Sequence, residues 1–111
     1  MAKRIQNLQR AATSPAMRQA LDLGARRWAF RIVWELRSGP LNFRKLQAAC
    51  GGVSPSVLQR RLHELRDLDL VSNTPGVGYR LTADGEKLFM VLAQLDRWAG
   101  SLDRNAWQKE D

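Results

Sequence analysis

The stretch SPSVLQRRLHELRDLDLV, residues 54–71, decides the fold that the sequence predicts. Ser54 is a strong helix cap, and Pro55 suits the first helical position because the N–H group that proline lacks would have no partner there. Three leucines then recur at helical spacing and predict one buried stripe: Leu58, Leu62 and Leu65. The stretch is therefore expected to form a well-capped amphipathic helix.

A second short helix is expected just before this one. Asn42 is its predicted cap, and Leu41 and Leu46 are spaced to pack against each other across that cap. Gly51 and Gly52 then end the helix. Two short helices joined by a tight glycine-rich turn are the sequence form of a helix-turn-helix, although many helical hairpins that bind nothing share it.

Two further helices are expected on the N-terminal side. Ser14 and Pro15 open the first, and Gly24 is expected to end it in the left-handed conformation. A longer helix should cover about 25–38, with three apolar residues on one face: Trp28, Ile32 and Leu36.

A short hairpin and a long helix should follow the helix-turn-helix. The first predicted strand begins at Leu70-Val71 and runs toward Thr74, residues 77–81 are the second, and Pro75-Gly76 is the turn between them. Thr82 caps the last helix. Its apolar residues step by four and three and form a seam: Leu88, Leu92, Leu95, Ala99 and Leu102. Three further residues widen this apolar surface: Phe89, Val91 and Trp98. This surface is too apolar for a small monomer, so a dimer is expected. The whole order is that of a winged helix.

The charge distribution suggests a polyanionic partner. Eighteen Lys and Arg against eleven Asp and Glu give a net charge of +7, and residues 1–66 alone hold thirteen basic and three acidic residues. A basic half favours nucleic acid first and an anionic membrane second, although a merely solvated surface is the plain alternative. No apolar run follows the basic N-terminal residues, so a cytoplasmic protein without a membrane span is expected.

The predicted helix over 54–67 has a polar outer face. On a helical wheel, four residues point away from the leucine stripe: Ser56, Gln59, Arg60 and His63. Such a face fits the major groove of DNA, where Arg pairs with guanine and Gln with adenine, so Arg60 and Gln59 are the predicted base-reading residues. Arg61 flanks the stripe and is expected to have a backbone or structural role. The alternative is that both arginines form only surface ion pairs, with Glu64 or Asp67.

Phosphate contacts are expected at the starts of both helices of the helix-turn-helix. Ser54 and Ser56 can bond phosphate or base, and the N–H groups of a helix start favour an anion. Arg44 and Lys45 begin the preceding helix, which in this fold crosses the phosphate backbone. Such contacts give affinity and salt dependence but little specificity.

The segments ALDLGARRWAFRIVWELRSGPLNFRKLQAACGGVSPSVLQRRLHELRDLDLV and YRLTADGEKLFMVLAQLDRWA resemble the HxlR-type winged-helix transcriptional regulators. The resemblance runs from about residue 14 to residue 98. Its most specific marks are the segment around Trp28, GPLNFRKL, VSPSVLQRRLHEL and YRLTADG. It implies a bacterial or archaeal DNA-binding homodimer that is held together by its first and last helices. The recurrent arginine of the family corresponds to Arg61, so both Arg60 and Arg61 stay candidates for DNA contact.

The sequence departs from the family pattern at three places. Many members carry a cysteine switch just before the first-helix proline, and Ser14 stands there instead, which argues against that route of redox sensing. Asp69 replaces a usual glycine and can still adopt the left-handed conformation at some cost. The hairpin is shorter than usual, and Asn73 and Arg80 are its polar candidates for DNA contact.

Cys50, the single cysteine, fits a small buried filler better than a redox sensor. No motif pairs a nucleophile with a base, so an enzyme is not expected. The tryptophans suit core and dimer packing, and a pocket for an aromatic effector between Trp28, Trp34 and Trp98 is their alternative use.

Together the patterns predict a mainly α (α+β) protein, a winged helix-turn-helix with a short two-stranded wing and a long C-terminal dimerisation helix. The expected parts are a basic extension over 1–13, the DNA-binding domain over 14–99 and a tail over 100–111. The expected function is a transcriptional regulator, a repressor rather than an activator, that binds an inverted repeat in double-stranded DNA as a homodimer. The alternative is a winged-helix adaptor that has lost specific DNA binding. No cofactor or metal is expected, and the effector is unknown.

Overall fold

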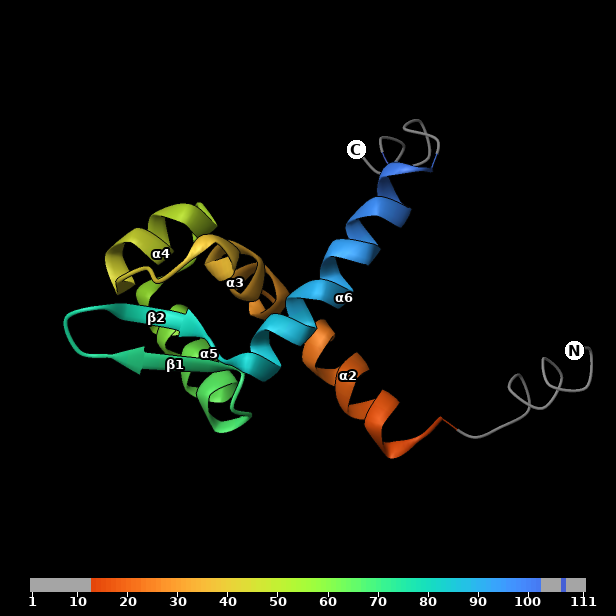
Figure 1. Ribbon diagram of the computed structural model, residues 1–111, viewed down its shortest axis with the longest axis horizontal. Helices are drawn as coiled ribbons and strands as arrows, with labels where there is room; N and C mark the ends of the chain where they lie inside the picture. The colour runs from red at the N-terminus through yellow and green to blue at the C-terminus, as the bar shows by residue number, and fades with distance from the viewer. Residues whose placement is uncertain (1–12, 103–106, 108–111) are drawn as a thin grey trace, which may run out of the picture.

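The computed structural model describes residues 13–102 and Trp107. The expected N-terminal extension, apart from Thr13, and most of the expected tail lie outside the described residues. The elements follow in the order α2 (Pro15–Ala25), α3 (Ala29–Glu35), η1 (Leu36–Ser38), α4 (Phe43–Cys50), α5 (Pro55–Asp67), β1 (Val71–Thr74), β2 (Gly78–Leu81) and α6 (Ala83–Gly100) (Figure 1). The predicted winged helix-turn-helix is confirmed: α4 and α5 form the helix-turn-helix, and β1 and β2 form the wing.

The four predicted helix caps are confirmed. In each case a side-chain oxygen accepts a hydrogen bond from the backbone N–H three residues later, which satisfies a donor that the helix itself leaves free. The caps and their distances are Ser14 to Met17 at 3.0 Å, Asn42 to Lys45 at 2.8 Å, Ser54 to Val57 at 3.3 Å and Thr82 to Gly85 at 3.0 Å.

The predicted helix over 25–38 is wrong in its first and last turns. The predicted left-handed helix end at Gly24 is also wrong, because α2 continues through Gly24 to Ala25. Helix α3 begins only at Ala29, after Trp28 has taken a left-handed conformation with φ of 79°. The last residues of the expected helix form the 3₁₀ turn η1. Glycine at position 24 leaves room for the Phe30 ring, since a Cβ there would lie 2.7 Å from a ring carbon of Phe30.

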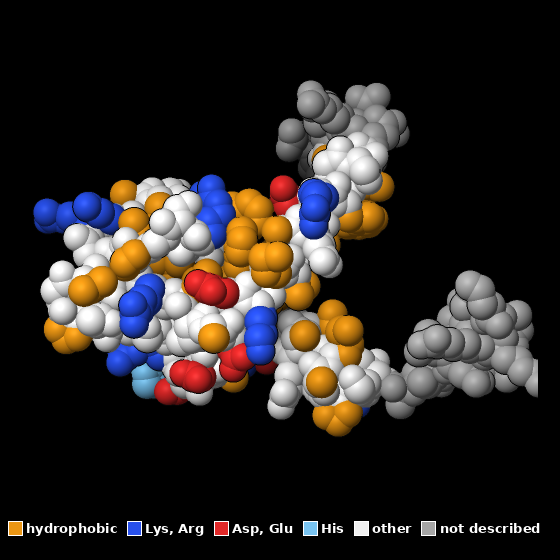
Figure 2. Space-filling view, viewed as in Figure 1, with side chains coloured by type: hydrophobic (Ala, Val, Ile, Leu, Met, Phe, Trp, Pro, Cys, Tyr) orange, Lys and Arg blue, Asp and Glu red, His pale blue; other side chains and the backbone are white. Residues whose placement is uncertain are grey.

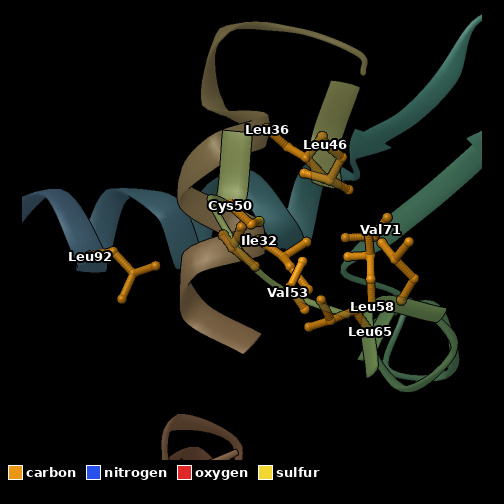
Figure 3. Close-up of a cluster of buried hydrophobic side chains, with 11 residues drawn as sticks. Ile32, Leu36, Leu46, Cys50, Val53, Leu58, Leu65, Val71 and Leu92 are labelled. Carbon is orange, nitrogen blue, oxygen red and sulfur yellow. The ribbon is translucent and has the colours of Figure 1, made fainter. Parts of the chain in front are cut away.

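The core lies where α3, α4 and α5 meet and is closed by β1 and α6 (Figure 3). Its least exposed members are five aliphatic residues: Ile32, Val33, Leu46, Leu58 and Leu65. Trp34 packs on this cluster, and its ring centroid lies 5.5 Å from that of Phe89 on α6. The leucine stripe of α5 is therefore buried, as the sequence predicts, and fixes which face of that helix remains outside.

The hairpin is tied to the start of α4. Strands β1 and β2 are antiparallel, with Asn73 opposite Tyr79, and the turn closes through a 2.9 Å hydrogen bond from the Val77 N–H to the Thr74 carbonyl. Leu41 exchanges two backbone hydrogen bonds with Tyr79, at 3.0 and 2.8 Å. These bonds hold the wing beside the helix-turn-helix.

Helix α6 starts in close contact with the segment that joins α5 to β1. Asp69 takes the predicted left-handed conformation, with φ of 59°, and its carbonyl accepts a 2.6 Å hydrogen bond from the Thr82 hydroxyl. Gly85 is buried against the Leu70 carbonyl, and a Cβ at this position would overlap the oxygen. The glycine thus allows α6 to pack on the base of the wing.

Helices α2 and α6 extend away from the body on the side opposite the hairpin turn (Figure 1). None of the residues of α2 is buried. Within the described residues, no helix has the length and hydropathy needed to cross a bilayer.

Candidate nucleic-acid interface

Helix α5 presents a polar face to solvent. Its inner stripe is fixed in the core, and Ser54 and Pro55 set where the helix begins. The outward residues of the helical wheel are all exposed: Ser56, Gln59, Arg60 and His63. The face is therefore free to contact a partner, and the major groove of DNA is wide enough to admit an α-helix.

Arg60 and Arg61 have different surroundings. The Arg61 side chain is only 16% exposed, and its Nε donates to the carbonyl of Arg27 at 2.9 Å. One of its terminal nitrogens bonds Glu64, also at 2.9 Å. Arg60 is exposed and forms no ion pair with another described residue. The structure thus gives Arg61 the intramolecular contacts of a structural role and leaves Arg60 outside.

The alternative of surface ion pairs holds for Arg61, which binds Glu64, but not for Arg60, because both acidic residues pair with other side chains. Glu64 pairs with Arg26 and Arg61, and the Arg26 hydrogen bond holds the pKa of its carboxyl below the ordinary value. Asp67 lies 3.3 Å from a ring nitrogen of His63. The outward guanidinium of Arg60 is consequently uncommitted within the described part of the chain.

The start of α4 adds positive charge. Arg44 and Lys45 lie in its first turn, where both side chains are exposed, and the Lys45 N–H is held by the Asn42 cap. Figure 2 shows Lys and Arg side chains over the half of the molecule that contains α4, α5 and the hairpin. A helix start with two exposed cations suits a phosphate group.

The two wing candidates lie on opposite faces of the hairpin. Side chains alternate along a strand, and Asn73 pairs with Tyr79, whereas Arg80 pairs with Ser72. Asn73 lines a groove of about 590 Å³ beside the second half of α5. Arg80 lines a different groove, of about 610 Å³, with Arg37. Only Asn73 is brought together with the outer face of α5.

The groove beside Asn73 contains one residue that the sequence reasoning missed. Arg66 lines it together with His63 and Asn73. Gln59, His63 and Arg66 follow one another at helical spacing, so the same wheel that selected Gln59 and His63 would have found it.

Some apolar residues of the α6 seam are packed in the core, and others are exposed to solvent. Leu92 belongs to the core, and Leu88 is partly buried against it. Leu95 and Trp98 are about half exposed, and Val91, which the sequence predicts beside the seam, is 60% exposed. Ala99 and Leu102 are partly buried. The outward apolar surface of α6 thus follows the line of Val91, Leu95 and Trp98, and Figure 2 shows hydrophobic side chains along α6 and over α2.

The aromatic pocket, the alternative use of the tryptophans, is only partly present. A groove of about 360 Å³ between α3 and α6 is lined by Trp34, Phe30 and Leu95, but neither Trp28 nor Trp98 reaches it. Cys50 is buried in the core, as expected, and burial raises the pKa of its thiol. A raised pKa disfavours the reactive thiolate.

The sequence matches the family model described as HxlR-like helix-turn-helix over residues 23–106. Two curated relatives from Bacillus subtilis are HTH-type transcriptional regulators: YvaP, 33% identical over 91 residues (77% of this chain and 84% of YvaP), and YodB, 32% identical over 91 residues (77% of this chain and 81% of YodB). Transcriptional regulators of this kind are not enzymes.

Solved structures agree with the sequence relatives. Quinone-bound YodB superposes with a TM-score of 0.75 at 30% identity, covering 81% of this chain and 100% of that one. A possible HxlR family transcription factor from Thermoplasma volcanium gives a TM-score of 0.72 at 28% identity, covering 85% and 89%. On the evidence of the family model, the relatives and the wing-bearing fold, the chain belongs to the HxlR family of winged helix-turn-helix transcriptional regulators.

Proposed function

We propose that this regulator is a repressor that binds an inverted-repeat operator as a homodimer in the cytoplasm. The observation that carries the proposal is the division of α5 into a buried leucine stripe and an exposed polar face that includes Gln59 and Arg60. Such a helix can place its polar face in a major groove while its leucine stripe stays packed in the core. Two such helices related by a two-fold axis would read half-sites roughly 34 Å apart.

The contacts divide into base readout and backbone binding. We assign Gln59 and Arg60 to base edges, because both are exposed in the first half of α5 and have the donor and acceptor groups for adenine and guanine. The remaining proposed contacts are to phosphates or the rim of the groove: Arg44, Lys45, Ser54, Ser56, His63, Arg66 and Asn73. We assign Arg61 a structural role, because it binds the Arg27 carbonyl and Glu64. Arg80 is assigned no base contact, because it lies on the other face of the hairpin from Asn73.

The dimer would form through α2 and α6. Helix α2 has no buried residue, although Met17 and Leu21 are large and apolar, and α6 exposes Val91, Leu95 and Trp98. An exposed apolar surface of this kind is typical of a protein–protein interface. Both helices lie away from the hairpin turn, so an interface there leaves α5 free for DNA.

A small aromatic effector belongs to the same proposal. YodB has been solved with a bound quinone, and the groove beside Trp34 in this chain is apolar and open. Binding there should quench tryptophan fluorescence in the parent protein and leave the Trp34→Phe variant unaffected. Equal quenching of the two proteins would place the ligand elsewhere.

The test of DNA binding is a titration with fragments from upstream of the protein's own gene at two salt concentrations, followed by a footprint. A repressor should hold one fragment far more tightly than random DNA and protect two symmetric half-sites. Weak binding that is equal for all fragments would instead support the adaptor.

A further inference from the structure

One carboxylate joins the first helix to the recognition helix. One oxygen of Glu64, on α5, accepts a 2.8 Å hydrogen bond from Arg26, the residue that ends α2. The other oxygen accepts a 2.9 Å hydrogen bond from Arg61. Arg26 also binds Asp22 at 2.8 Å, one turn back on α2. We call these four residues, Asp22, Arg26, Glu64 and Arg61, the ionic clamp.

The clamp closes on the chain between α2 and α3. Nε of Arg61 donates to the carbonyl of Arg27, and the next residue is Trp28 with its left-handed backbone. A bulky residue in that conformation costs free energy and persists only where its surroundings impose it. The clamp thus attaches α5 both to the end of α2 and to the turn that sets the direction of α2.

Apart from the clamp, α2 is held mainly by the packing of Gly24 against the Phe30 ring and by Leu23. The helix has no buried residue, and the leucine nearest the body, Leu23, is only partly buried against the core. Apolar burial therefore contributes little to the angle of α2, and the ion pairs of Arg26 contribute a correspondingly larger share. Glu64 is the central member, because its two carboxylate oxygens accept hydrogen bonds from both arginines, Arg26 at the end of α2 and Arg61 on α5.

We propose that Glu64 is a positioning residue that fixes the angle between α2 and α5 and thereby the separation of the two recognition helices in the dimer. The inference rests on the proposed function, since the separation matters only if α2 helps to form a dimer that reads two half-sites. Specific binding requires both helices to enter successive major grooves together. Non-specific binding depends on phosphate contacts and tolerates a misplaced helix.

The direct test measures the angle and needs no operator. Spin labels at Gln19→Cys on α2 and Gln59→Cys on α5 report the distance within one chain when labelled protein is mixed with excess unlabelled protein. Cys50 is buried and should not take the label. Glu64→Gln should shift or broaden the distance distribution. Glu35→Gln is the matched control, because Glu35 has a similar side-chain exposure and loses a single ion pair within α3.

The functional test compares the same variants on DNA. Relative to Glu35→Gln, Glu64→Gln should bind the operator about tenfold more weakly, the effect of losing a charged hydrogen bond, while its affinity for random DNA stays the same. It should also discriminate less between operators whose half-site spacing differs by one base pair. Unchanged spin-label distances in Glu64→Gln would overturn the inference. If the distances change but the parent shows no preferred fragment, the proposed function fails while the positioning role of Glu64 in the fold stands.

Discussion

Arg60 and Arg61 are adjacent on α5, yet the guanidinium of Arg61 binds the Arg27 carbonyl and Glu64 while that of Arg60 stands in solvent. Consecutive residues on a helix are separated by about 100° around its axis, so one arginine can flank the core while the next faces outward. The same side-chain chemistry therefore supports two roles, one in holding the helix and one in contact with a partner.

Replacing Arg60 by alanine should weaken operator binding by about 1–3 kcal/mol and relax base preference at one position in each half-site. The fold should not change, because the side chain is exposed. Band-shift titrations on a set of single-base operator variants measure both effects. Lys87→Ala removes one exposed positive charge on α6 and serves as the control. Full operator affinity in Arg60→Ala would show that α5 does not read bases through this residue.

Replacing Arg44 by alanine should weaken binding to all DNA sequences alike. A phosphate contact releases counterions, so its loss should reduce the slope of log affinity against log salt by about one. Titrations of operator and random DNA at several salt concentrations give the slope. A loss confined to the operator would instead assign Arg44 to base readout.

Leu92 and Leu95, neighbours in the predicted seam, should respond differently to alanine. Leu92 is 7% exposed and Leu95 is 49% exposed. Leu92→Ala should lower the free energy of unfolding by about 2–5 kcal/mol, since it leaves a cavity. Leu95→Ala should instead raise the dissociation constant of the dimer, as measured by sedimentation over a range of concentrations. A Leu95→Ala protein that dimerises like the parent would exclude this part of α6 from the interface.

Protonation of Glu64 should remove its contribution to stability. The hydrogen bond from Arg26 lowers the pKa of this carboxyl in the folded state below the ordinary 4.5. Folding therefore gains from the ionised form above pH 4.5, and the gain is lost as the pH falls through the lowered folded-state pKa. The difference in unfolding free energy between the parent and Glu64→Gln should be largest near neutrality and shrink in acid. Urea titrations across this range measure it, and a difference independent of pH would contradict the ion pair.

Replacing Gly85 by alanine should destabilise the protein by about 1–3 kcal/mol or more, because the new methyl group overlaps the Leu70 carbonyl and pushes α6 off the base of the wing. Gly100→Ala, in the same helix, adds a methyl group that would meet no described atom within 4 Å beyond the adjacent residues and the backbone of α6. This control should be neutral or slightly stabilising, since alanine favours a helix. Thermal unfolding compares the two variants. Equal melting temperatures would show that the segment around Leu70 can shift to make room for the methyl group.

Local features of the fold were predictable from the sequence. Caps such as Asn42 and Ser54 depend on one side chain and a backbone group three residues away, so the pattern alone locates them. The left-handed Trp28 was not predictable. The carbonyl before it is bound by Arg61, which lies 34 residues further along the chain, and a local sequence pattern does not contain such a contact.

The candidate site was predictable to a similar extent. The helical wheel separated the buried stripe of α5 from its exposed face, including Arg60, because that division follows from periodicity. Which face of the hairpin Arg80 occupies depends on strand register, which the wheel does not address. The seam of α6 was ambiguous for another reason: the same apolar spacing serves a chain's own core, as Leu92 does, or a second chain.

The outer face of α5 has a consequence for how this scaffold evolves. Gln59 and Arg60 are exposed, whereas the neighbouring leucines carry the packing of the helix. Substitutions at the outward positions leave the core packing unaltered. After gene duplication, the DNA sequence that is recognised can therefore change while the protein still folds. Relatives of this chain should accordingly differ more at positions 56, 59, 60 and 63 than at 58, 62 and 65.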